Sequence, residues 1–171
     1  MDVIKKYEKN LISYDLLYKY RYKDIKEIPC IRSVKLCLNI KKRFDFKIIL
    51  SDLTALEILS SNKCEILKAK KTITPLKIRK NQPVGCNVIL RKNKKNKFLS
   101  FLSNKAIEFK YSKTPSPKGF IIKGMISNLL TLPEFENNYK ILKNLNSLDF
   151  LICTNTKSKY ELNFLLNSYK I

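Results

Sequence analysis

The spacing of the apolar residues, which changes repeatedly between two periods, places the tightest constraint on the fold. From Val34 to Ile40 every second side chain is apolar, and this alternation predicts a strand with one buried face. Four further strands are predicted in the segments "CEILKAKKT", "CNVILR", "FIIKGM" and "SLDFLICTNT". Between the strands, apolar residues recur every three or four positions. That period predicts helices at 3–20, in "ILSDLTALEILSS", in "KFLSFLSNKAI" and near the C-terminal end.

Each predicted helix has an apolar face that we expect to be buried. On the N-terminal helix this face comprises Ile4, Tyr7, Leu11, Tyr14 and Leu17. On the second helix it comprises Leu50, Leu53, Leu56 and Ile58 or Leu59, and on the third Phe98, Leu99, Leu102 and Ile107. The last helix is expected to begin at a capping box formed by Ser158 and Glu161 and to bury Leu162, Leu165 and Leu166.

The connections carry their own signals. Residues 72–83 contain two prolines and a run of cationic and amide side chains, so they are predicted to form the loop of a hairpin. "SKTPSPKG" is predicted to be a second loop, and Lys92–Lys97 a short basic turn. The segment "LPEFENNYKILKNL" is predicted to be a loop with a helical turn. Glycine is rare, so the chain's three glycines are expected where φ is positive or the backbone is closely approached, with a bulge at Gly124.

This order of elements predicts the fold class. Four or five strands interleaved with helices favour an α+β two-layer sandwich with a mostly antiparallel sheet. The helices are expected to cover one face and leave the other free. At 171 residues the chain is expected to form a single domain spanning 1–171, with an N-terminal helix at 3–20 and a projecting basic loop at 71–84.

The charge indicates the class of partner. Lys and Arg number 35 against 14 Asp and Glu, which gives a net charge of +21. Self-repulsion of this size opposes compaction, so we expect the folded molecule to meet a polyanion. Nucleic acid is the favoured polyanion, and an anionic membrane surface is the alternative. No apolar run approaches the ~20 residues of a membrane span, and the N-terminus resembles neither a signal peptide nor a good transit peptide.

The residue types argue against catalysis. The chain has no histidine, which excludes a histidine base, and it has no glycine-rich phosphate-binding motif. Its five cysteines lack metal-ligand spacing and are expected to be free thiols in a reducing compartment. The nearest acidic pairs, Glu134 with Glu136 and Asp45 with Asp52, are expected to be solvated surface groups. We therefore expect no enzyme, no cofactor and no metal, but a compact basic RNA- or DNA-binding domain.

A family resemblance enters through "AKKTITPLKIRKNQPVGCNVILR". This stretch is similar to the central signature of the universal large-subunit ribosomal protein number five, which binds 5S rRNA: a basic strand end, a loop ending in K-I-R, then P-V-G-C and a strand closing in L-R. Four more segments agree in the same order: "IPCIRSVKLCLNI", "ALEILSSNKCEILKAKK", "GFIIKGMISNLLTLPEF" and "LDFLICTNTKSKYELNFLL".

The resemblance implies an α+β sandwich that binds 5S rRNA in the central protuberance of the large subunit. It implies further contacts with large-subunit rRNA, with peptidyl-site tRNA, and with neighbouring ribosomal proteins including one of the small-subunit head. It places 5S rRNA contacts at Asn39, Asn62, Leu76, Ile89, Arg91 and Asp149. The tRNA-facing loop would present Lys71, Lys77, Arg79, Lys80, Asn81 and Gln82, and we expect its tip at Lys80–Gln82.

Several positions depart from the family pattern. The family more often has Gln, Phe and Thr where this chain has Asn62, Leu76 and Ile89, and it usually has glycine where this chain has Lys92. The 112–119 segment is shorter than the bacterial pattern, which weakens the case for an unchanged bridge to the small subunit. Together with a composition typical of an A+T-rich genome, this drift favours a mitochondrial copy, with a plastid copy as the alternative.

Two other functions remain open at this point. The chain could be a free RNA- or DNA-binding regulator, or a peripheral membrane protein that binds through its basic N-terminal helix.

Overall fold

The computed structural model describes residues 6–39, 46–103, 109–117, 119–127, 129, 135, 142 and 145–169. In these residues, six strands form one antiparallel sheet in the order β2-β3-β1-β6-β5-β4. Their bounds are β1 Ile31–Asn39, β2 Glu65–Lys68, β3 Pro83–Leu90, β4 Phe109–Ser116, β5 Gly119–Ile126 and β6 Leu148–Thr154. The α-helices are α2 Ser13–Tyr20, α3 Phe46–Ser60, α4 Lys92–Leu102 and α7 Lys159–Tyr169.

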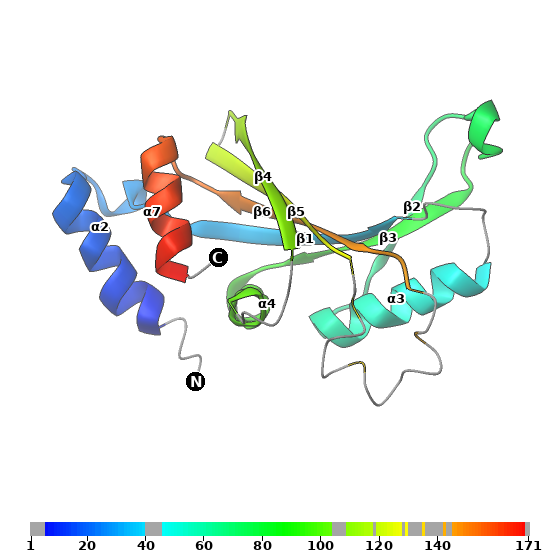
Figure 1. Ribbon diagram of the computed structural model, residues 1–171, viewed down its shortest axis with the longest axis horizontal. Coiled ribbons are helices and arrows are strands. Elements are labelled where there is room, and N and C mark those ends of the chain that lie inside the picture. Colours follow the sequence, from blue (N-terminus) through cyan, green and yellow to red (C-terminus); the bar gives the residue numbers. More distant parts are fainter. Residues whose placement is uncertain are drawn as a thin grey trace.

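Three shorter helical turns complete these elements. The π-helix η1 Glu8–Ile12 precedes α2, and the 3₁₀ turns η2 Ile25–Glu27 and η3 Thr74–Leu76 lie in connections. In Figure 1, α3 and α4 lie on one side of the sheet, and α2 and α7 lie at one end; the other side carries no helix from the described part of the chain. The predicted α+β sandwich is confirmed.

The core is built from alternate residues of the four inner strands. Leu36 of β1 lies opposite Val88 of β3 and Phe150 of β6, and all three are buried. Equivalent rows run above and below it, because each strand turns every second side chain toward the helices. These rows comprise Cys86, Leu38, Leu148 and Ile126, and Leu90, Val34, Ile152 and Ile122.

Glycine fits two places where this packing is tight. Gly124 lies opposite Phe150, and a Cβ at this position would lie 2.2 Å from Cζ of that ring. Gly85 lies opposite Asn39, and a Cβ there would lie 2.5 Å from the carbonyl oxygen of Leu38. Gly119, in turn, has φ +129°. The expectation for the three glycines is therefore confirmed, but the predicted bulge at Gly124 is wrong, because the ladder runs through it without interruption.

The N-terminal helix is confirmed for the residues described, but the predicted face was wrong. Ile12 and Leu16 are buried, whereas Tyr7, Leu11 and Tyr14 are 39%, 51% and 67% exposed. The wider π-turn of η1 rotates the residues after it relative to a regular α-helix. The second helix shows a smaller error, since Ile49 is buried and Leu50 is exposed. The predicted residues Ile4 and Asp45 lie outside the described residues.

Two segments predicted to be irregular are regular elements. Lys92–Lys97 forms the first turns of α4 rather than a turn of its own, and two of its residues, Lys95 and Asn96, are buried. "SKTPSPKG" is largely β4, which pairs with β5 from Phe109 to Ser116. Repeated lysines in the first and prolines in the second concealed elements that are fixed by tertiary pairing.

The last helix agrees with its prediction. The Ser158 hydroxyl accepts a hydrogen bond from the amide of Tyr160, and Glu161 accepts one from the amide of Ser158. These bonds satisfy amides that the first helical turn leaves without partners. The predicted apolar face is buried, namely Leu162, Leu165 and Leu166. Among the described residues, no helix is both long and apolar enough to cross a membrane.

Candidate nucleic-acid interface

Among the described residues no helix covers the face of the sheet opposite the core rows, and we call it the open face. Its residues alternate with those of the core rows, so Lys35 lies between Ile89 and Leu151, and Cys37 lies between Asn87 and Asp149. Cys37 and Asn87, near the middle of this face, are themselves largely buried. Ile89 is 48% exposed despite its apolar side chain. An exposed isoleucine among polar and cationic neighbours can pack against the flat face of a nucleic-acid base without removing water from a charged group.

Asn39 and Asp149 are joined on the open face. The side-chain amide of Asn39 donates a hydrogen bond to a carboxylate oxygen of Asp149, 3.1 Å away. The two residues are diagonal neighbours on β1 and β6, since Asp149 lies opposite Cys37. Three predicted contacts, Asn39, Ile89 and Asp149, thus share one surface.

Arg91 and Asn62 lie at one end of this surface, beyond the strands. Arg91 follows β3 as the N-cap residue of α4, and its side chain is exposed. Asn62 lies in the α3–β2 connection, where its side-chain carbonyl accepts a short hydrogen bond from the ammonium group of Lys94. Lys94 also donates to the carbonyl of Ser61 at 2.7 Å. The sixth predicted contact, Leu76, is in η3 of the projecting loop, not on the open face.

The loop between β2 and β3 is held by its own hydrogen bonds. Ile73 and Ile78 form an isolated antiparallel bridge that closes the outer part around η3. Nearer the sheet, the amide of Asn81 donates to the carbonyl of Ala69 at 2.9 Å. The Gln82 side chain accepts from the amide of Arg79 at 2.9 Å. The loop is therefore preorganised, and in Figure 1 it extends beyond the end of the sheet with η3 at its tip.

This geometry corrects the expected position of the tip. Lys80, Asn81 and Gln82 lie at the base, because Asn81 and Gln82 both bond Ala69, beside β2. Asn81 has φ 66° in the turn from Arg79 to Gln82, a conformation that asparagine tolerates better than most residues. The outermost cation is Lys77, which follows η3 with φ 54°.

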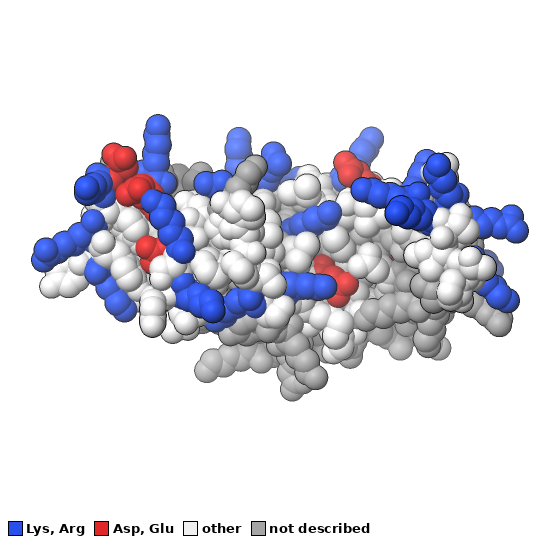
Figure 2. Space-filling model, turned by 90° about the horizontal axis from the view of Figure 1, so that it is seen from above, with Lys and Arg blue, Asp and Glu red and all other residues white. Residues whose placement is uncertain are grey.

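Positive charge gathers on the loop and around the open face. Residues 66–107 contain no Asp or Glu. Figure 2 views the molecule from the side opposite α3 and α4: Lys and Arg side chains stand along the margin and cluster at both ends, while much of the middle is uncharged. The exposed cations from the end of β2 through the loop are Lys68, Lys70, Lys71, Lys77, Arg79 and Lys80.

Some residues of this surface were missed by the sequence analysis. Lys94 was assigned to a turn, although it lies beside Asn62. Met125 and Lys123 face the same side as Asp149 and Leu151, their cross-strand partners. Strand alternation could have identified both, since buried Ile122 and Ile126 fix which face the intervening residues occupy.

Within the described residues the titratable side chains do not gather into a metal-binding cluster. No group of three or more Cys, Asp or Glu side chains could hold a metal ion there. Burial raises the pKa of the Cys64 and Cys86 thiols to about 11, so neither is an activated nucleophile. Asp52 is fully buried rather than solvated as expected: its carboxylate accepts hydrogen bonds from the backbone and side chain of Asn146. Glu134 and Glu136 lie outside the described residues.

Comparison with known proteins places the chain. No model of a known protein family matches it. The large ribosomal subunit protein uL5m of Reclinomonas americana is 33% identical, over 100% of this chain and 97% of the relative. The uL5 proteins of Clostridium acetobutylicum and Nitrosomonas europaea are 32% and 31% identical, over 95% and 96% of this chain and 92% and 94% of their own lengths. The chain belongs to the uL5 family of large ribosomal subunit proteins.

The uL5 match confirms the resemblance found in the sequence. Because it runs over nearly the full length of each of these proteins, it includes both the open-face strands and the β2–β3 loop. The organellar version of the family is supported by the uL5m relative.

Proposed function

We propose that this chain is a structural constituent of the large ribosomal subunit and binds 5S rRNA in the central protuberance through its open face. The observation that carries the proposal is the position of Asn39, Ile89 and Asp149 together on the helix-free side of the sheet. The open face combines an exposed isoleucine with a hydrogen-bonded amide–carboxylate pair. Bound RNA would contact both, because it has apolar base faces as well as polar groups.

The margin and the middle of the open face would contribute differently to binding. Lysines at the margin neutralise phosphates and so raise the affinity for RNA. This contribution does not depend on the base sequence of the RNA. Asp149 cannot approach a phosphate closely, because both are anions. It can accept hydrogen bonds from a ribose 2′-hydroxyl or a base N–H, and Asn39 can both donate and accept. These groups would therefore supply specificity rather than bulk affinity.

The projecting loop is proposed to contact peptidyl-site tRNA. Its exposed cations lie on a segment that is already ordered by the Ile73–Ile78 bridge and the bonds of Gln82. A preordered loop loses little conformational entropy when it binds. Its extension beyond the sheet allows it to reach a second RNA while the open face holds the first.

The opposite edge of the sheet is proposed to face other parts of the ribosome. The strand order puts β4 at one edge and β2, which leads into the loop, at the other. The β4–β5 hairpin is therefore the element we assign to the contact with a protein of the small-subunit head, with large-subunit rRNA and neighbouring proteins around it. We place the protein in mitochondrial ribosomes, supported by the uL5m relative, with plastid ribosomes as the alternative.

The test compares two arginine variants of the purified protein for 5S rRNA binding. Arg91→Ala is expected to weaken binding by about tenfold, because an arginine fork at a strand end meets phosphate or a base edge with fixed geometry. Arg21→Ala, which removes the same charge from the exposed C-cap of α2, outside the open face, should change binding no more than about twofold.

Co-sedimentation separates this function from its rivals. The protein should sediment with large subunits at moderate salt, whereas a free regulator would not, and a peripheral membrane protein would instead bind anionic vesicles through residues 3–20. Equal losses in the two arginine variants would contradict specific 5S recognition and leave only general phosphate attraction.

A further inference from the structure

The open face contains a hollow beside the residues that we assign to 5S rRNA. Its volume is about 370 Å³, near the lower end of the range for small-ligand sites, which suits a ligand the size of a single base. It lies where the α3–β2 connection and the start of β2 meet β3. Its lining comprises Asn62, Lys63, Glu65, Asn87, Val88 and Ile89. Two of these, Asn62 and Ile89, are predicted 5S contacts, so the hollow is continuous with that surface.

Strand alternation turns the side chains of the hollow to the open face. Glu65 on β2 lies opposite Asn87 on β3, and Asn87 in turn lies opposite Cys37 on β1. The neighbouring residue of β3, Cys86, belongs to the buried rows on the helix side. Ile89 follows Asn87 by two residues and therefore points to the same side. A carboxylate, an amide and an apolar side chain thus surround one hollow.

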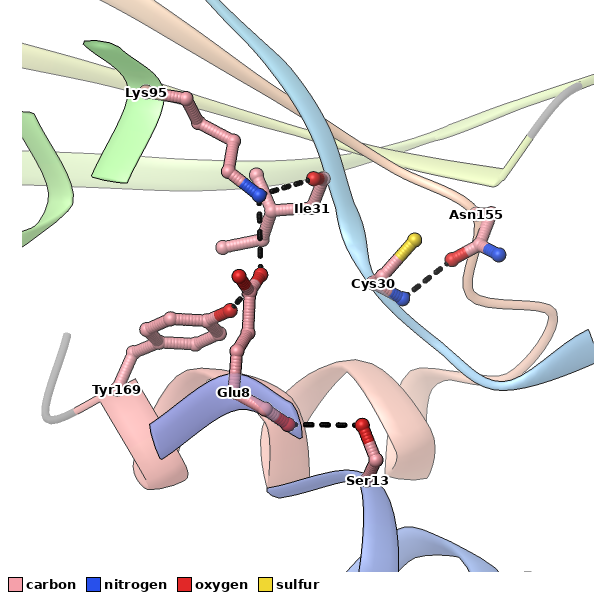
Figure 3. Close-up of polar contacts among 7 residues, drawn as sticks. All are labelled: Glu8, Ser13, Cys30, Ile31, Lys95, Asn155 and Tyr169. Carbon is pink, nitrogen blue, oxygen red and sulfur yellow. Dashed lines mark hydrogen bonds and ion pairs between the residues drawn. The ribbon is translucent and has the colours of Figure 1, made fainter. Parts of the chain in front are cut away.

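The carboxylate of Glu65 is unpaired. Its side chain is exposed, and it makes no hydrogen bond or ion pair with the described residues. Figure 3 shows the contrasting case of Glu8, which is held by hydrogen bonds from the ammonium group of Lys95 and the hydroxyl of Tyr169. An unpaired anion on a surface that meets RNA lowers the affinity, unless the RNA brings hydrogen-bond donors to it. Glu65 therefore marks a position where the RNA is expected to present donors.

Two amides beside Glu65 retain hydrogen-bonding capacity. Asn87 is 7% exposed, yet its side chain makes no hydrogen bond with the described residues, and its polar atoms are not fully enclosed. Native structures rarely leave such an amide without a water or ligand partner. The side-chain oxygen of Asn62 accepts from Lys94, so its nitrogen is left to donate. The hollow thus sets amide donors beside a carboxylate that only accepts.

This set of donors and acceptors matches guanine better than the other bases. A carboxylate can accept two parallel hydrogen bonds, and the Watson–Crick edge of guanine presents two neighbouring donors, N1–H and N2–H. The next atom along that edge, O6, is an acceptor and suits the free amides of the hollow. Adenine, cytosine and uracil each present only one donor group on this edge.

An arginine of a partner protein is the other ligand that could bind Glu65 through two N–H groups. A guanidinium group has no acceptor for the nitrogen of Asn62 or the ammonium group of Lys63, which also lines the hollow. It would also be repelled by a chain of net charge +21. The continuity of the hollow with the proposed 5S surface favours RNA as the ligand.

We propose that the hollow receives a single unpaired guanine of the bound RNA and that Glu65 selects this base. The carboxylate of Glu65 accepts N1–H and N2–H, while O6 accepts from the amide of Asn62 or Asn87. The ring packs on Ile89, and a flanking phosphate lies against Lys63. This inference rests on the proposed function, because it takes the open face as the RNA-binding surface. It adds a selection of base that phosphate contacts do not provide.

The test measures binding of the full-length protein to three RNA hairpins that differ in one base. Each has a loop of uridines with a central guanosine, inosine or adenosine, and fluorescence anisotropy gives the dissociation constants. The guanosine hairpin should bind at least about fivefold more tightly than the adenosine hairpin, because adenine cannot form the bidentate contact. Inosine lacks the N2 amino group and should fall between them. Equal affinity of the guanosine and adenosine hairpins, or no detectable binding of the guanosine hairpin, would overturn the proposal.

The variant Glu65→Gln tests the assigned contact through the direction of its effects. It should weaken binding of the guanosine hairpin severalfold, but hold or strengthen binding of the adenosine hairpin, because it also removes a negative charge. If Glu65 acted through its charge alone, both hairpins would bind more tightly. Asp15→Asn, which removes a carboxylate charge at an exposed position of α2, is the matched control and should keep the wild-type preference for guanosine. The melting temperature of Glu65→Gln should stay near that of wild type, since the side chain is exposed.

Two outcomes would overturn the role of Glu65. One is an unchanged preference for guanosine in Glu65→Gln. The other is tighter binding of both hairpins by the same factor, which would leave Glu65 as a general repulsive charge or as the partner of a cationic protein side chain.

The result can be separated from the test of 5S rRNA binding. If Arg91→Ala weakens 5S binding while the guanosine and adenosine hairpins bind alike, the proposed function stands and the selection of guanine fails. If Arg91→Ala leaves 5S binding unchanged while the preference for guanosine depends on Glu65, the proposed function fails and the hollow remains a guanine site.

Discussion

The side-chain amide of Asn39 donates a 3.1 Å hydrogen bond to the carboxylate of Asp149 across the central strands β1 and β6. The bond orients both side chains on the open face, and each keeps further hydrogen-bonding capacity for a ligand. It also makes the effect of replacing the side-chain nitrogen of Asn39 by oxygen predictable.

Asn39→Asp should weaken 5S rRNA binding by about tenfold or more, because it puts two carboxylates together on a surface that faces an anion. Filter binding at two salt concentrations measures the loss. Asn167→Asp adds the same charge on α7 and controls for net charge. The double variant Asn39→Asp with Asp149→Asn should restore the melting temperature by restoring an amide–carboxylate pair. Unchanged binding in the single variant would remove Asn39 from the interface.

Lys92→Gly should stabilise the protein by about 1 kcal/mol, since Lys92 has φ 50°, a conformation that costs non-glycine residues about 1–2 kcal/mol. Lys92→Ala removes the same charge but keeps the strain, so it is the control. The free energies of unfolding from urea titrations decide between them. A glycine variant no more stable than the alanine variant would mean that the strain is relieved elsewhere.

Gly124→Ala should destabilise the sandwich by about 1–3 kcal/mol, because the new methyl group would overlap the ring of Phe150. Phe150→Leu alone also destabilises, by opening a cavity. In the double variant the methyl group occupies space that the ring has left. The loss of stability should therefore be smaller than the sum of the two single losses. Simple additivity in thermal unfolding would argue against this contact.

Lys77→Gly should weaken retention of peptidyl-site tRNA modestly and leave 5S rRNA content unchanged. Its φ of 54° suits glycine, so the substitution removes the outermost ammonium group without distorting the loop. An exposed charge contact contributes only about 1 kcal/mol or less, so tRNA dissociation from reconstituted ribosomes should accelerate severalfold. Loss of 5S rRNA with unchanged tRNA release would move the loop to the 5S interface.

Asp52 makes stability depend on pH in a predictable direction. Burial raises the pKa of its carboxyl group above the unfolded value, although the bonds from Asn146 partly offset the effect. Its favourable contribution is therefore fully present below about pH 3.9 and is lost as the pH rises through the folded pKa. Relative to Asp52→Asn, which does not titrate, the wild type should gain stability as the pH falls from 7 toward 4. A difference independent of pH would contradict the raised pKa.

The sequence predicted best those features that repeat locally. Alternation in β1 and β6 identified the buried face, and the capping box located the start of α7, because each depends on neighbours along the chain. Lys95 was predicted wrongly. A lysine in a lysine-rich run is expected to be exposed to solvent, yet Lys95 is buried against Glu8, which lies 87 residues away in the sequence. No local pattern contains that pairing.

The candidate site likewise contains some residues that the sequence predicted and others that only the structure reveals. Asn39 and Asp149 follow from strand parity once the buried face is known, and the family resemblance named them. The contact between Asn62 and Lys94 depends on how the α3–β2 connection meets α4, so it required the structure. The position of the loop's tip also required the structure. It depends on the bridge between Ile73 and Ile78, which could not be predicted from the two prolines of the loop.

The position of β6 beside β1 has a consequence during synthesis. Strand β1 ends at Asn39, but one of its two partners begins only at Leu148, so the middle of the sheet cannot close until most of the chain has left the ribosome that makes it. Until then one edge of a hydrophobic strand is unpaired on a nascent chain whose lysines attract any nearby RNA. Pairings so distant in sequence close slowly, and unpaired strand edges are prone to wrong partners. Newly made chains are thus vulnerable to misassembly until β6 has emerged, which makes early capture by a folding factor advantageous.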